Sequence, residues 1–271
     1  MRRCLVTLAL LICENCFAAT VIPIEIEKGN PVATARINGV AARLIIDSGG
    51  GFVSLKSETL GRVAAVRTGS TRSSTDALGH SAVHTLFTLD ALEVGGDTFT
   101  SVAAEEASQY GADAPGDGSI GRNFLNRFIV VYDYPSRKIT LFTPDERRAA
   151  QRECRGVRVR TIRDPDEIIV SMATTDHGAM RVLWDTGATY SFVKKAFADG
   201  QALPIDAPFY ISKRFVFARQ DFGPLRLVVL DFKAPINVDG YIGYNFFMGH
   251  VVCIDPFERV VKIRKLSPGG S

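Results

Sequence analysis

Two short segments occur twice in this chain, in the same order, and this repetition limits its possible folds more than any other feature. Residues 43–52 read RLIIDSGGGF and residues 181–190 read RVLWDTGATY. A second matching pair lies downstream, with DGSIGRNF starting at Asp117 and DGYIGYNF starting at Asp239. Repetition of both segments in order predicts an internal duplication, in which one polypeptide contains two copies of the same half.

Each copy of the first segment leads an apolar strand into Asp, a hydroxyl residue and Gly. Such a sequence presents a carboxylate at the end of a buried strand, at Asp47 in the first half and at Asp185 in the second. The Gly lets the backbone turn tightly and approach a neighbour closely. The same residue types also end ordinary strands as turn formers. The second copy favours a functional site over a turn.

The two halves together resemble a known family. Each half contains Asp-Ser-Gly or Asp-Thr-Gly after an apolar strand. This motif is followed by Ser-Ile-Gly at residues 119–121 in the first half and by Tyr-Ile-Gly at residues 241–243 in the second. The pattern is similar to that of the aspartic proteases of the pepsin and retropepsin type. The resemblance is closest to bacterial retropepsin-like proteins with both halves in one chain, and it covers almost everything after residue 20. It implies an all-β, two-lobed aspartic-protease-like β-barrel fold with one active site between the lobes.

The resemblance implies an aspartic endopeptidase with Asp47 and Asp185 as its catalytic residues. Two adjacent carboxylates hold one proton over a broad pH range, because both cannot ionise cheaply. One then acts as a base toward water while the other polarises the carbonyl group under attack. We expect no cofactor and no metal, because the few histidines and cysteines form no pattern of metal ligands. Apolar substrate subsites are a further expectation from the family.

Six further residues carry expected supporting roles. The hydroxyl residues tie the two active-site loops together, the glycines after them let the loops approach, and two later glycines let a neighbouring strand pass behind each loop. These residues are Ser48, Gly49, Thr186, Gly187, Gly121 and Gly243.

The chain departs from the pepsin pattern at Gly50 and Ala188, where pepsin-like enzymes often have a hydroxyl group bonded to the catalytic carboxylate. A carboxylate with fewer hydrogen-bond donors has a higher pKa. We therefore predict an activity optimum in mildly acidic to neutral conditions.

The first half has 16 more positions between its two motifs than the second half. Residues 68–93 account for them and are predicted to form a polar hairpin. The resemblance implies that this hairpin is a flap over the substrate, and a surface hairpin without a role is the alternative. No Tyr occurs in the expected tip. The tip residues are Thr75, Asp76, Ala77, Leu78, Gly79 and His80.

Residues 1–19 have the layout of a signal peptide: a basic start, an apolar run over residues 4–13 and small residues at the end. The run is short for a bilayer-spanning segment. Lipid attachment at Cys13 is an alternative, disfavoured because the bulky Ile12 precedes it. We therefore expect a periplasmic or secreted protein with no membrane span in the mature chain.

We divide the mature chain into an N-terminal lobe, residues 20–150, and a C-terminal lobe, residues 151–271. The Arg-rich residues 143–167 are interpreted as a solvated connector. A net charge of +3 suggests no nucleic-acid partner. We expect a monomer that acts on peptide or protein substrates.

Two cysteines, Cys154 and Cys253, remain after the signal peptide. Export permits a disulfide between them. We favour Cys253 as a buried packing residue, because it lies in the apolar run VVCI, while Cys154 lies in the polar connector.

Two other functions compete with the protease. One is a non-catalytic peptide- or protein-binding member of the same fold, and the other is a structural β-protein whose motifs are only turns. Two carboxylates held face to face are electrostatically unfavourable in a binding protein, so their presence favours the enzyme.

Overall fold

The computed structural model describes residues 19–75, 79, 81–107, 114–162, 164, 168–201, 205–206, 208–232 and 236–266. Most of them lie in strands, and the longest described helix has seven residues. The predicted all-β class is therefore correct. The expected signal peptide up to residue 18, Cys13 within it, and the tip residues Asp76, Ala77, Leu78 and His80 lie outside the described residues. No described helix is long and apolar enough to cross a membrane.

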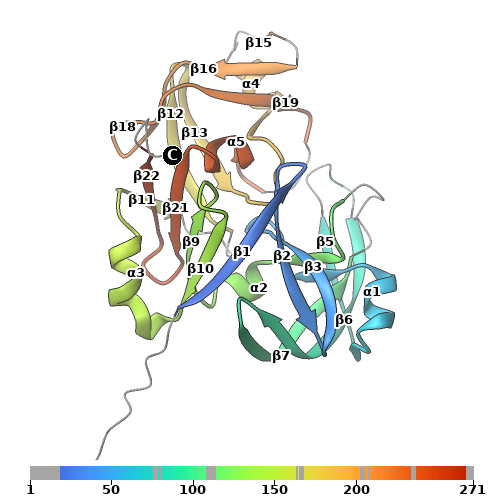
Figure 1. Ribbon diagram of the computed structural model, residues 1–271. Coiled ribbons are helices and arrows are strands. Elements are labelled where there is room, and N and C mark those ends of the chain that lie inside the picture. The colour runs from blue at the N-terminus through green and yellow to red at the C-terminus, as the bar shows by residue number, and fades with distance from the viewer. Residues whose placement is uncertain are drawn as a thin grey trace, which may run out of the picture.

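The first lobe, blue to green in Figure 1, is built around a parallel pair of strands. Strand β3 delivers the chain to Asp47 and lies beside β8, while β4 pairs with both β8 and β7. The elements are β1 (Thr20–Glu27), β2 (Asn30–Ile37), β3 (Val40–Ile46), β4 (Val53–Leu55), α1 (Ser57–Arg62), β5 (Val66–Thr75), β6 (Ser81–Val94), β7 (Asp97–Glu106), β8 (Gly118–Ile120) and α2 (Arg122–Leu125).

The second lobe, yellow to red in Figure 1, repeats this plan. Strand β13 runs parallel to β20, and β14 pairs with both β20 and β19. The elements are β12 (Val170–Thr175), β13 (Gly178–Trp184), β14 (Phe192–Lys194), α4 (Lys195–Gly200), β15 (Ile205–Asp206), β16 (Phe209–Ser212), β17 (Phe215–Phe217), β18 (Gln220–Asp221), β19 (Leu225–Leu230), β20 (Gly240–Ile242) and α5 (Tyr244–Phe247). The predicted internal duplication is confirmed.

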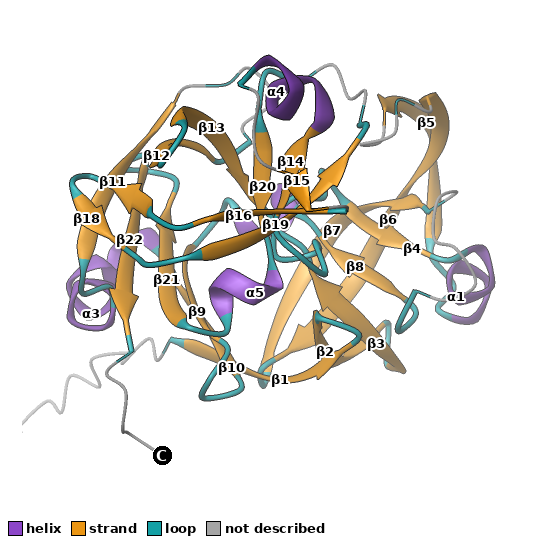
Figure 2. Ribbon diagram, turned by 90° about the horizontal axis from the view of Figure 1, so that it is seen from above, coloured by secondary structure: helices purple, strands orange, loops and turns teal. Residues whose placement is uncertain are grey.

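An antiparallel sheet joins the lobes, in the order β1, β10, β9, β21, β22 and β11. Its middle pair, β9 and β21, consists of equivalent strands from the two halves, and Figure 2 shows them side by side. The strands not yet given are β9 (Ile129–Asp133), β10 (Lys138–Phe142), β11 (Val157–Ile162), β21 (His250–Asp255) and β22 (Val260–Lys265).

The interpretation of residues 143–167 as a solvated connector is wrong for much of the segment. It forms a 3-10 turn (Pro144–Glu146), helix α3 (Arg147–Glu153) and strand β11 of the joining sheet. Helix α3 packs the buried Ala150 onto the outer face of this sheet, beside Val131 and Val251. Its arginines remain largely exposed, which is why the sequence looks like a connector.

The expectation that Cys253 is only a packing residue is also wrong. Cys154, at the end of α3, and Cys253, on β21, form a disulfide with Cα atoms 5.4 Å apart. Both residues are buried in the cluster between α3 and the sheet. The sequence favoured an unpaired Cys253 because nothing in it showed that the polar segment turns inward at residue 154.

One hydrophobic core extends through both lobes. Large aromatic side chains meet where the halves join: the ring of Phe247 lies 5.2 Å from that of Tyr134 and 5.8 Å from that of Tyr132, centroid to centroid. Trp184, fully buried, packs edge-on against the same Phe247. The two aspartate loops therefore rest on a shared, rigid base.

Candidate active site

Each predicted aspartate stands at the end of an apolar strand, held by its parallel neighbour. The backbone N–H of Asp47 donates to the carbonyl of Ile120 at 2.9 Å, and that of Asp185 donates to Ile242 at 3.0 Å. The strand residues before the aspartates are fully buried. Burial of β3 and β13 thus fixes the position from which each carboxylate projects.

The two hydroxyl residues link the loops across the lobe boundary by a reciprocal set of hydrogen bonds. The backbone N–H of Ser48 donates to Oγ1 of Thr186 at 2.9 Å, and the N–H of Thr186 donates to Oγ of Ser48 at 3.0 Å. Each hydroxyl then donates to a strand carbonyl of the other lobe, Ser48 to Trp184 and Thr186 to Ile46. Both side chains are buried, so the four bonds act where water does not compete.

The glycines after the hydroxyl residues let each loop lie against the opposite carboxylate. A β-carbon at position 49 would lie 2.5 Å from Oδ2 of Asp185, and one at position 187 would lie 2.6 Å from Cγ of Asp47. Asp47 and Asp185 therefore face each other across Gly49 and Gly187.

Backbone N–H groups orient each carboxylate. Oδ1 of Asp47 accepts from Gly49 at 2.9 Å and from Gly50 at 2.8 Å, while Oδ1 of Asp185 accepts from Gly187 at 2.9 Å. A β-carbon at position 50 would lie 2.6 Å from Oδ2 of Asp47. The first loop therefore supplies a backbone donor at the position where pepsin-like enzymes often use a hydroxyl group.

The pKa of Asp185 is raised well above its usual range. Burial is the largest cause, and the negative charge of Asp47 is the second. The hydrogen bond from Gly187 and the positive charge of Arg122 oppose this rise in pKa without cancelling it. The pair therefore retains a proton into a pH range in which an isolated aspartate is ionised.

Gly121 and Gly243 lie directly behind the loops. A β-carbon at position 121 would lie 2.6 Å from the carbonyl carbon of Phe52, and one at position 243 would lie 2.6 Å from that of Tyr190. Such contacts are shorter than carbon–carbon contact distances allow. The structure thus brings all eight proposed dyad and support residues into one constellation.

The sequence interpretation gave no role to the matched asparagines Asn123 and Asn245, although both belong to the repeat. The side-chain oxygen of Asn123 accepts from the N–H of Val53 at 2.8 Å, and that of Asn245 accepts from Ser191 at 2.7 Å. They fix the segments that follow the aspartate loops. Their occurrence at equal positions in both halves is the signal that would have found them.

Arg122 was also missed. Its Nη1 donates to the carbonyl oxygen of Gly49, and its charge lowers the pKa of Asp185 against the effect of burial. Its counterpart in the second half is Tyr244, so the repeat gives no hint of it.

The predicted polar hairpin is present, formed by β5 and β6. Thr75 and Gly79 of the expected tip are described: Oγ1 of Thr75 lies 3.0 Å from Oγ of Ser81, and Gly79 has a φ of 89°. Closer to the base of the hairpin, Arg72 binds Glu105 at 2.7 Å and stacks over the ring of Phe52 at 4.6 Å. The hairpin is thereby attached beside the first aspartate loop.

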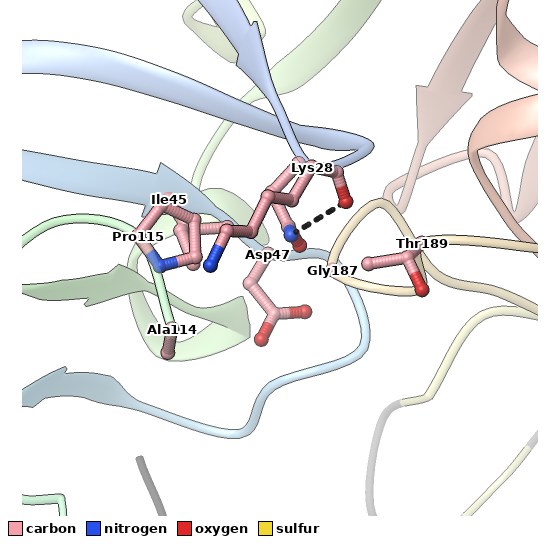
Figure 3. A pocket seen from close by; sticks show the side chains of 8 residues that line it. Lys28, Ile45, Asp47, Ala114, Pro115, Gly187 and Thr189 are labelled. Carbon is pink, nitrogen blue, oxygen red and sulfur yellow. Dashed lines mark hydrogen bonds between the residues drawn. The ribbon is translucent and has the colours of Figure 1, made fainter. Parts of the chain in front are cut away.

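A pocket of about 300 Å³ opens beside the dyad. Asp47 and Gly187 form the side nearest the carboxylates, and Ile45, Ala114 and Pro115 add an apolar wall (Figure 3). Among the described residues, no cluster of His, Cys, Asp or Glu is suited to a metal ion. The site thus combines a pair of carboxylates with adjacent space for a side chain.

Comparisons with known proteins bear on the family and on the fold. Residues 33–124 match the family model described as aspartyl protease. The crystal structure of an aspartic proteinase from Irpex lacteus has a similar fold, with a TM-score of 0.64 at 14% sequence identity, over 92% of this chain and 98% of that one. No curated protein matches the chain. At this identity, the structural likeness concerns the fold.

Proposed function

Because the chain belongs to the aspartic protease family, we propose that it is an endopeptidase that hydrolyses peptide bonds with a water molecule activated by Asp47 and Asp185. The observation that supports this most is the facing pair of carboxylates, each directed at the glycine of the opposite loop. Both loops come from one chain, so a monomer contains the complete site.

The chemistry follows from the unequal environments of the two groups. The raised pKa of Asp185 keeps one proton on the pair. We propose that this proton lies on Asp185 when water attacks, so that Asp47 is the base. Asp47 removes a proton from the water as its oxygen attacks the carbonyl carbon, and the proton of Asp185 passes to the carbonyl oxygen. The tetrahedral intermediate then collapses: one of its hydroxyl groups returns a proton to Asp185, the C–N bond breaks, and the proton on Asp47 goes to the leaving nitrogen.

We also propose that the protein is exported. Its first 19 residues have the composition of a signal peptide. The disulfide between Cys154 and Cys253 supports this proposal, because such bonds persist mainly in oxidising compartments.

The test is cleavage of a mixed peptide library, followed by mass spectrometry. We expect the wild type to cleave, and Asp47→Asn and Asp185→Asn each to reduce kcat/KM by about 10³-fold or more, because each removes one member of the dyad. Asp199→Asn is the matched control, since Asp199 is exposed on α4 and pairs with Lys195. Specific peptide binding without cleavage by the wild type would instead support the non-catalytic binding protein.

The pH dependence of cleavage provides a second test of this proposal. Activity needs one ionised and one protonated carboxyl group, and the raised pKa of Asp185 keeps its proton at higher pH. We therefore expect kcat/KM to peak in mildly acidic to neutral buffer. A maximum in strong acid would contradict this assignment of the two groups.

A further inference from the structure

We propose that the pocket beside the dyad selects peptides with an acidic side chain next to the scissile bond, and that Lys28 recognises this side chain. This inference rests on the proposed function and names its substrate class. It differs from the family expectation of apolar subsites.

The position of the pocket determines which part of a substrate enters it. Asp47 and Gly187 contribute to its lining, and a β-carbon on Gly187 would touch the carboxyl group of Asp47. A peptide whose scissile carbonyl lies over the dyad therefore places a neighbouring side chain here. A volume of about 300 Å³ accommodates one such side chain.

The backbone of Lys28 is fixed at the rim of this pocket. The residue lies in the turn between β1 and β2, with a φ of 48°. The next residue, Gly29, has a φ of 83°, and a β-carbon there would lie 3.0 Å from the carbonyl oxygen of Thr189. The buried Asn30 donates to the carbonyl of Lys28 at 3.4 Å. The turn is thus held against the second aspartate loop.

The side chain of Lys28 lies over the pocket. In Figure 3 it extends from the turn toward the wall formed by Ile45 and Pro115, with its nitrogen above that wall. Lys28 and Asp47 are the ionisable residues among those described in the lining. The apolar wall lowers the local polarity, which strengthens a charge interaction with the ammonium group.

The charges around the dyad are compatible with an acidic substrate. The raised pKa of Asp185 keeps one proton on the pair, which limits the dyad to one negative charge. The guanidinium groups of Arg72 and Arg122 lie near Gly51, on the same lobe, with Nη2 atoms 3.6 and 3.9 Å from the position of a β-carbon there. The positive charge of Arg122 acts on Asp185, and Lys28 adds a positive charge to the lining of the pocket beside Asp47.

The experiment uses peptides based on one cleaved sequence, with Glu, Gln or Lys at each position beside the scissile bond. At one of these positions we expect wild-type kcat/KM to favour Glu over Gln by about five- to tenfold, as for a partly shielded ion pair. Lys28→Met should abolish the preference, Lys28→Glu should shift it to the Lys peptide, and Lys28→Arg should preserve it. Lys195→Met, on the exposed face of α4, should leave the wild-type ratio unchanged.

Binding measurements separate this inference from the proposed function. The Glu and Gln peptides are titrated into Asp185→Asn by calorimetry, with and without Lys28→Met. Tighter binding of the Glu peptide that depends on Lys28 supports the inference even if no variant cleaves. Equal binding and equal cleavage of the two peptides, or a preference that survives Lys28→Met, overturns it while the endopeptidase stands.

Discussion

At the scale of single residues, the glycines of the site are required for their lack of a side chain. The family resemblance implies that Gly121 and Gly243 let a neighbouring strand pass close behind each loop. In the structure, the segments after the aspartate loops pass directly over the α-carbons of these two glycines. The sequence identified the right positions from the repeat, but it contained no information about which atoms lie above them.

The first prediction concerns this crowding. Gly121→Ala should displace the segment at Phe52, reduce kcat/KM by at least about tenfold and destabilise the protein by about 1–3 kcal/mol, as overpacking does in a tight core. Gly61→Ala is the matched control, because a β-carbon on this glycine of α1 meets nothing within 4 Å. The control should be neutral or slightly stabilising. Urea unfolding and peptide kinetics measure both effects, and equal behaviour of the two variants would refute the argument.

The second prediction follows from the raised pKa of Asp185. A group whose pKa is higher in the folded state stabilises the fold at low pH, and this contribution is lost as the pH rises through the folded pKa. Wild type should therefore lose stability between about pH 4, the usual pKa of Asp, and the higher folded value.

Asp185→Asn removes this ionisation. Between acidic and mildly alkaline pH, the free energy of unfolding of this variant should rise relative to that of wild type by on the order of 1 kcal/mol, since one pKa unit corresponds to about 1.4 kcal/mol. Melting temperatures measured across this range provide the check. Parallel curves for the two proteins would show that the carboxyl group is not perturbed.

At the scale of elements, the hairpin of β5 and β6 was predictable, but its attachment was not. Alternating residues and a glycine in the turn locate the hairpin from local sequence alone. Its anchor depends on Glu105, which is 33 positions from Arg72 and lies on a different strand. Glu105 is 5% exposed and also accepts from Ser54 at 2.9 Å. A long-range pair of this kind leaves no periodic signal in the sequence.

The third prediction tests this anchor. Arg72→Met leaves the carboxylate of Glu105 buried without its cation, which should destabilise the protein by about 2–4 kcal/mol. Adding Glu105→Gln should recover part of the loss, because the buried charge is then removed. Arg67→Met, on the same strand over the ring of Phe87, is the control. Denaturant unfolding of wild type, Arg72→Met, Glu105→Gln and the double variant gives the coupling between the two residues, and additive losses would contradict the proposed pair.

At the scale of the whole molecule, the repeat predicted two lobes and one site between them, and the fold agrees. The sequence did not predict every element of the sheet that joins the lobes. Strand β11 and helix α3 lie in a segment whose many arginines suggested a connector. Few apolar residues suffice there, because α3 covers part of the outer face of a sheet that is already formed by other strands.

The fourth prediction concerns the disulfide that fastens α3 to this sheet. Cys154 and Cys253 are 99 residues apart, and closing a loop of this length should stabilise the fold by about 2–5 kcal/mol. The double variant Cys154→Ala and Cys253→Ala should therefore unfold at a lower denaturant concentration. Adding a reductant should lower the unfolding midpoint of the wild type to a similar degree and leave the midpoint of the double variant unchanged. An unchanged midpoint in both experiments would contradict a structural role for the bond.

The contact between β9 and β21 has a consequence for each half on its own. These strands occupy equivalent places in the repeat and pair along their edges. Cutting the chain between the halves would leave each fragment with an exposed edge strand whose backbone N–H and C=O groups are unpaired. The same edge strand on a second identical fragment can pair with it, and the two fragments are then related by a twofold axis. A separated half is therefore expected to assemble into a symmetric homodimer.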